Sequence, residues 1–183
     1  DDPISVANGE TKTCTITNTF IPPKGSITVC KIAMDSEGNV ITGTAGTTFT
    51  VPGITPNPVT SQGAPVGEIA DSVFTTPLAL NSSILEEGEG NDAQCITYSD
   101  LAIGGYYYGE EQIVGSGWAA PKYNDQNTID IEDASDFYTY SGELFDGNAG
   151  NDESRDQNAD GHILLTTDRP DRTLVVLNQQ GTS

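Results

Sequence analysis

Short runs of β-branched residues, each ended by glycine, proline, asparagine or aspartate, fill most of this chain. Alternation of apolar and polar residues over such runs is typical of strands, and no stretch shows the apolar period of a long amphipathic helix. The pattern therefore predicts an all-β sandwich. The clearest predicted strands are residues 11–20, 26–33, 47–51, 94–98, 105–114, 137–140, 162–166 and 172–178.

Two breaks in the pattern indicate how the chain is divided. Pro22 and Pro23 cannot donate to a strand ladder, so they separate residues 11–20 from the next strand. Residues 35–39 (DSEGN) are a strong turn signal. We therefore expect residues 1–22 to form a separate strand that closes a neighbouring domain or is donated to one. Residues 23–183 are expected to form a single sandwich domain, which is long enough to bury a core.

The chain is strongly acidic. Twenty-seven acidic residues against seven basic ones give a formal net charge of −20. Such a charge repels nucleic acid and anionic membranes, so we expect neither as a partner. It serves solubility, or it indicates metal binding or a cation-rich habitat. No apolar stretch is long enough to span a bilayer, and the first residues lack the features of a signal peptide. We expect a removed leader or a longer parent chain.

Three cysteines, Cys14, Cys30 and Cys95, make an odd number. Secreted, strand-rich chains generally use cysteines in disulfides, and the usual zinc spacings are absent here. One disulfide with one cysteine left over would suit an intermolecular bond. Buried free thiols are the alternative.

One internal repeat stands out. Residues 12–18 (KTCTITN) match residues 172–178 (RTLVVLN) in character and spacing, at a constant offset of 178 − 18 = 160. A chance similarity between two β-branched strands is the alternative. The repeat indicates that the chain holds two closing strands, although one domain needs only one.

An acidic loop near the C-terminus has the start of a calcium site. Asp156, Asn158 and Asp160, followed by glycine, follow the D-x-N-x-D-G pattern, in which alternating oxygen side chains converge on one cation. Asp152 lies just upstream and could supply a further oxygen. Thr167 stands where the pattern has a bidentate glutamate, so an acidic loop without metal is the alternative.

No enzymatic constellation can be argued from the residues. The single histidine, His162, has no serine or cysteine placed to form a catalytic group with it, so we expect no enzyme. Exposed aromatic side chains in a cleft would instead favour an adhesin that binds carbohydrate or protein. The candidates for such a surface are Tyr106, Tyr107, Tyr108 and Trp118, and burial of these rings would favour a structural role.

Several segments together resemble the Cna protein B-type, or prealbumin-like, domains of bacterial surface proteins and pilins. Residues 26–43 resemble the family's opening hairpin, with a lysine-bearing strand before an Asp-x-x-Gly-Asn turn. Residues 98–111 and Trp118 resemble its central signature, and residues 172–178 resemble its last strand. The resemblance implies an Ig-like or prealbumin-like β-sandwich, here with an extra N-terminal strand and acidic loop insertions.

The resemblance also implies a covalent crosslink. Many such domains join a lysine of the first strand to an asparagine of the last strand, assisted by a buried carboxyl group. The matching positions here are Lys31 and Asn178, with Glu111 or Glu110 as the carboxyl, and the family spacing favours Glu111. A lysine in an apolar core becomes a neutral nucleophile, and a buried glutamic acid can shuttle protons. The alternative is a Lys31 that points outward from a half-exposed strand.

These features together predict a structural subunit of an extracellular filament or cell-surface stalk. Its partners would be copies of itself or adjacent repeats, and residues 11–20 would join them head to tail. Either the strand closes the preceding domain of a tandem-repeat stalk, or it is donated to a neighbouring subunit, which gives an open filament. The adhesin is the alternative function.

Overall fold

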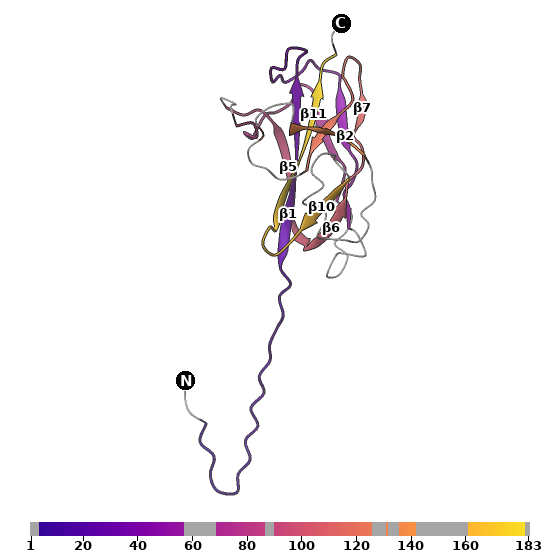
Figure 1. The fold of residues 1–183 in the computed structure, drawn as a ribbon. Helices are drawn as coiled ribbons and strands as arrows, with labels where there is room; N and C mark the ends of the chain where they lie inside the picture. Colours follow the sequence, from indigo (N-terminus) through magenta and orange to yellow (C-terminus); the bar gives the residue numbers. More distant parts are fainter. Residues whose placement is uncertain are drawn as a thin grey trace.

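The computed structural model describes residues 4–56, 69–86, 90–125, 131, 136–141 and 161–181, and these residues contain strands and no α-helix (Figure 1). The all-β prediction is confirmed at this level. The strands are β1 (Lys24–Met34), β2 (Thr48–Val51), β3 (Thr55–Pro56), β4 (Ser72–Thr75), β5 (Gln94–Ala102), β6 (Gly104–Tyr107), β7 (Gln112–Val114), β8 (Lys122–Asn124), β9 (Tyr138–Thr139), β10 (His162–Leu165) and β11 (Asp171–Gln179).

The largest sheet places the first and last strands of the domain side by side. Its order is β5-β1-β11-β8-β9, so β1 lies between β5 and β11. β1 and β11 are parallel, and the register pairs Lys31 with Val176 and Ala33 with Asn178. The other strands form two three-stranded sheets, β10-β6-β3 and β4-β2-β7. The strand that opens the domain therefore runs beside the strand that closes it.

Two apolar clusters lie on opposite faces of the largest sheet, and β11 supplies both. Leu174 and Val176 belong to the main cluster, with residues of β2, β4, β6 and β10. Val175 and Leu177 belong to a second cluster, with Cys30, Ile32, Ile131 and Phe137. Alternate side chains of a strand point to opposite faces, so a near-continuous apolar run is what a strand covered on both faces requires.

The predicted strand at residues 11–20 forms no ladder in the structure. Residues 4–23 are exposed and leave the domain as an extended thread (Figure 1). Ile16 and Phe20 are 82% and 81% exposed. A strand needs a neighbour to pair with, and both edges of β1 are already taken by β5 and β11. The alternating pattern is present here, but the segment pairs with no strand among the residues that the structure describes.

The predicted strand at residues 105–114 is two strands. β6 ends at Tyr107 and pairs with β10, whereas β7 begins at Gln112 and pairs with β2 in a different sheet. The run from Gly105 to Val114 contains no proline and no strong turn signal, so the sequence alone does not reveal the break. Gly109 lies between the two strands and packs against Pro52. This break places Glu111 between two sheets.

Candidate functional site

Lys31 is fully buried in β1. Its side chain enters the interior, and the ammonium nitrogen Nζ lies 4.3 Å from the centre of the Phe49 ring on β2. A buried amine needs polar partners, because the loss of hydration is costly. The side chain does not point to solvent, which was the alternative left open by the sequence.

Asn178 supplies one of these partners from β11. It follows Val176, the register partner of Lys31, by two residues, and so its side chain lies on the same face of the sheet as that of Lys31. Asn178 is fully buried, and the Nζ of Lys31 donates to its Oδ1. The Nδ2 of Asn178 donates to the carbonyl oxygen of Ala119, at 3.2 Å. The amide group is therefore held at both ends.

Glu111 completes the cluster. Its two carboxyl oxygens lie 2.9 and 3.2 Å from the Nζ of Lys31, and its side chain is buried. Its backbone N–H donates to the hydroxyl oxygen of Tyr123, at 2.7 Å, which fixes the chain at this point. Glu110 is exposed. Of the two glutamates that the sequence offered, the structure brings Glu111 to the lysine.

Burial changes the ionisation of the pair. It lowers the pKa of Lys31 from 10.5 to about 8, and the nearby Glu111 carboxyl limits the decrease. Burial raises the pKa of Glu111, against the opposing effects of Lys31 and Asn178. Desolvation disfavours the charged form of both groups. Both shifts move the pair toward a neutral amine beside a protonated carboxyl group.

This arrangement suits the formation of an amide between two side chains. A neutral Lys31 amine has a free electron pair, and the adjacent Asn178 carbonyl is the electrophile it would attack. A protonated Glu111 can donate a hydrogen bond to the carbonyl oxygen, pass its proton to the leaving nitrogen Nδ2, and accept the proton that the attacking Nζ loses. The bond that forms is Nζ–Cγ, the bond that breaks is Cγ–Nδ2, and ammonia leaves. No oxidant or cofactor is needed.

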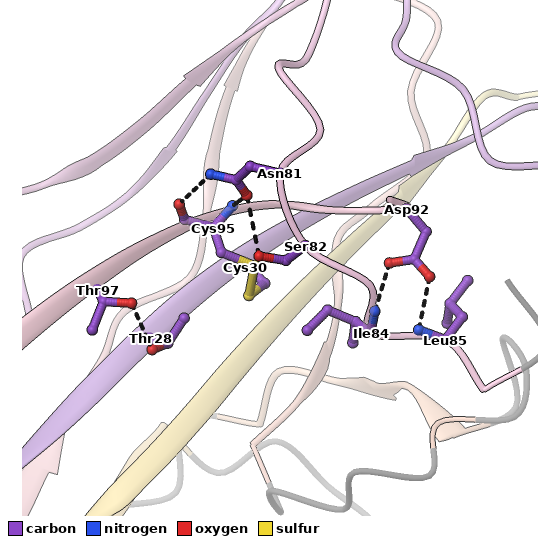
Figure 2. The surroundings of a disulfide bond; sticks show 9 residues. All are labelled: Thr28, Cys30, Asn81, Ser82, Ile84, Leu85, Asp92, Cys95 and Thr97. Carbon is purple, nitrogen blue, oxygen red and sulfur yellow. Dashed lines mark hydrogen bonds between the residues drawn. A yellow bond between two sulfur atoms is a disulfide. The ribbon is translucent and has the colours of Figure 1, made fainter. Parts of the chain in front are cut away.

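A disulfide lies on the neighbouring residue of β1. Cys30 pairs with Cys95 of β5, and the two residues are also opposite each other in the antiparallel ladder (Figure 2). Cys14 is exposed and free. Because alternate side chains point to opposite faces, Cys30 ties β1 to β5 on one face and Lys31 meets β11 on the other. The number of cysteines alone does not say which two form a disulfide. The pairing follows from the β1–β5 ladder, which places Cys30 opposite Cys95.

Two side chains near the disulfide stabilise the loop before β5 (Figure 2). The amide of Asn81 donates to the Cys95 carbonyl and accepts from the Cys95 N–H, at 3.1 and 2.8 Å. The buried carboxylate of Asp92 accepts from the N–H groups of Ile84 and Leu85. Neither residue was predicted. In an acidic, loop-rich chain, nothing local distinguishes an asparagine or aspartate that binds backbone groups from one that is solvated.

The four aromatic residues named as a candidate adhesive surface differ in burial. Tyr106 and Tyr108 are buried in the main cluster, whereas Tyr107 and Trp118 are half-buried. Trp118 packs edge-on against Phe49, with ring centres 5.2 Å apart, and its indole N–H donates to the Thr47 hydroxyl at 3.0 Å. Burial of Tyr106 and Tyr108 favours a structural role for these two rings.

The calcium prediction lies outside the described residues. Asp152, Asp156, Asn158 and Asp160 all belong to residues 142–160. In the described part of the chain, no group of three or more His, Cys, Asp or Glu side chains could hold a metal ion. His162 is buried at the start of β10, with its ring 5.7 Å from that of Tyr107.

No protein-family model matches this chain, and no curated protein matches it. Within the described ranges, no helix is long and apolar enough to cross a membrane.

Proposed function

We propose that this chain is a structural unit of an extracellular filament or cell-surface stalk. The domain is a prealbumin-like sandwich of the Cna B type, and it is locked by an isopeptide bond between Lys31 and Asn178 with Glu111 as the assisting acid. The observation that carries the proposal is the buried contact of these three side chains between the first and last strands. A lysine and a glutamate buried together are costly to maintain, and such a cost is typical of a functional site.

The position of the crosslink suits a protein that bears tension. The N-terminal segment joins β1 at one end of the domain, and the parallel β11 ends at the other (Figure 1). A pull along the fibre would therefore shear β1 against β11. A bond between Lys31 and Asn178 carries that force directly from one strand to the other. The chain between these two residues, whose sequence separation is 147, is then outside the loaded path.

The disulfide supports the extracellular part of the proposal. Cys30 and Cys95 close a loop with a sequence separation of 65. Such bonds persist in oxidising compartments and are rare in the reducing cytosol. With the disulfide on one side and the proposed crosslink on the other, β1 is covalently attached to both of its neighbours.

The N-terminal segment supports assembly. Residues 4–23 carry the largely exposed apolar side chains of Ile4, Val6, Ile16, Phe20 and Ile21, none of which belongs to the core. An alternating, unpaired segment of this kind is suited to completing the sheet of another domain. Such a contact joins different surfaces of the two domains, so repetition gives an open chain of domains.

The decisive experiment is intact-mass measurement after reduction of the disulfide. The expected result is a mass lower than the sequence mass by one ammonia, with a linked Lys31–Asn178 peptide after digestion. Asn178→Ala and Glu111→Gln should each restore the full mass. The matched controls are Glu110→Gln and Lys122→Ala, which change exposed residues of the same types and should leave the deficit. A full mass in the folded wild-type chain would refute the crosslink.

A further inference from the structure

The exposed segment before β1 has the side-chain arrangement of β11. With the offset of 160, Cys14, Ile16 and Asn18 correspond to Leu174, Val176 and Asn178. In β11 these three positions point toward the main core and the Lys31 site. Asn18 therefore corresponds in sequence to Asn178, the asparagine that contacts the lysine. The apolar residues Cys14 and Ile16 precede it at positions that share its face of a strand.

The opposite face differs between the two segments. Thr15 and Thr17 correspond to Val175 and Leu177, which pack in the second cluster. Threonine at both positions suits a strand whose outer face is in contact with water. The segment therefore fits a sandwich with a filled interior and an uncovered outer sheet face.

The domain in this chain cannot accept the segment. Its β11 already fills the place beside β1. Distance excludes it as well, since the site of Asn178 lies beside Ala33, nine residues along β1 from Lys24. Nine strand residues occupy about 30 Å. The six residues from Asn18 to Lys24 span at most about 22 Å when fully extended. Asn18 cannot reach Lys31 of its own domain.

We propose that residues 11–18 are the last strand of a second sandwich of this kind, which precedes them in the same polypeptide, and that Asn18 is a second crosslinking residue. The inference rests on the proposed function, because it extends the chemistry of Lys31 and Asn178 to another domain. The first-strand lysine of that domain attacks Cγ of Asn18. The Nζ–Cγ bond forms and the Cγ–Nδ2 bond breaks, one proton passes from Nζ to Nδ2 through the glutamate of that domain that corresponds to Glu111, and ammonia leaves.

A separate copy of this chain is the less suitable partner. Every copy has its own β11, buried between β1 and β8, so the site for the segment is filled. A domain that ends in residues 11–18 has no such competitor. Residues 19–23 then form the connection between two sandwiches, and Pro22 and Pro23 stiffen it. Two crosslinks in series would leave only the chain from Asn18 to Lys31 under load between domains.

The test is a two-domain chain in which residues 24–170 are followed directly by residues 11–183. Its first domain can be closed only by residues 11–18, while its second domain keeps β11. Reduced intact mass should show the loss of two ammonia molecules, and digestion should link Asn18 to the lysine of the first domain. Asn18→Ala should leave a loss of one, and Asn178→Ala should also leave a loss of one.

In the first domain, Thr15 and Thr17 would take the places of Val175 and Leu177. The second cluster would then lose two apolar side chains, and this loss alone could prevent folding. A second version therefore carries Thr15→Val and Thr17→Leu, which restore the packing of β11 on that face. If both versions lose only the ammonia that depends on Asn178, residues 11–18 are not a crosslinking strand and the inference is overturned. If the single-domain chain itself loses none, the failure lies in the proposed function, and the two cases are distinguished.

Discussion

The amine of Lys31 contacts the side-chain oxygen of Asn178 across two parallel strands, although the two residues are 147 positions apart in the sequence. The contact is buried on all sides, and Glu111 lies against the amine. Three polar groups that would each be costly to bury alone contact one another here. Their arrangement leads to the first prediction.

The first prediction concerns pH and uses Asn178→Ala, in which the amine of Lys31 stays titratable. The pKa of Lys31 in the folded state is about 8, below its ordinary 10.5. Between these values the unfolded chain binds more protons than the folded one, so the free energy of unfolding should rise with pH across this window. Chemical denaturation at several pH values measures it.

Glu111 acts in the opposite sense in this variant. Its folded pKa is raised above 4.5, so the folded state keeps a proton that the unfolded state has lost. Stability should therefore fall as pH rises above 4.5. Lys31→Met combined with Asn178→Ala is the control, and it should lose the rise between about 8 and 10.5. A rise of equal size in the control would show that other groups produce it.

The second prediction concerns the disulfide. Replacing Cys30 and Cys95 with alanine opens a loop with a sequence separation of 65 and should lower the free energy of unfolding by about 4 kcal/mol. Cys14→Ala is the matched control, because Cys14 is exposed and free, and it should leave stability unchanged. Thermal denaturation compares the three proteins. Equal melting temperatures would indicate that the disulfide does not contribute to stability.

The third prediction concerns the N-terminal segment. Deleting residues 1–22 should leave the melting temperature of the domain unchanged, because residues 4–22 are exposed and β1 begins at Lys24. In the two-domain chain of residues 24–170 followed by residues 11–183, the same segment should close the first domain. Ile16→Asp should destabilise that first domain, because Ile16 corresponds to the buried Val176 of β11. Thermal denaturation measures the effect, and an unchanged transition of the first domain would exclude the segment as its closing strand.

The fourth prediction concerns calcium. If Asp156, Asn158 and Asp160 bind it, removal of the metal by a chelator should lower the melting temperature, because a ligand bound only by the folded state adds stability. Asp156→Asn with Asp160→Asn should abolish the difference. The matched control is Glu37→Gln, which changes an exposed acid in a turn. No effect of chelation, together with no heat of binding, would leave these residues as an acidic loop.

The sequence by itself determined the local structure of this protein. Runs of β-branched and apolar residues bounded by glycine, proline and aspartate placed β1 and β11 to within a few residues, because strand propensity and turn signals are local properties of the chain. The turn at residues 35–39 is equally local. The Oδ1 of Asp35 accepts from the N–H groups of Glu37 and Asn39, so the turn depends on neighbours in sequence. The resemblance indicated Lys31 and Asn178, which the structure brings together.

Only the tertiary structure decided which distant groups meet. It brought Glu111, and not Glu110, to the amine of Lys31. Both glutamates lie in the connection between β6 and β7, which belong to different sheets, so strand alternation does not decide where they point. It paired Cys30 with Cys95 through the β1–β5 ladder. It paired residues 11–20 with none of the described strands, although their pattern is that of a strand. Strand character is a property of a segment, whereas pairing depends on which edges the rest of the fold has already filled.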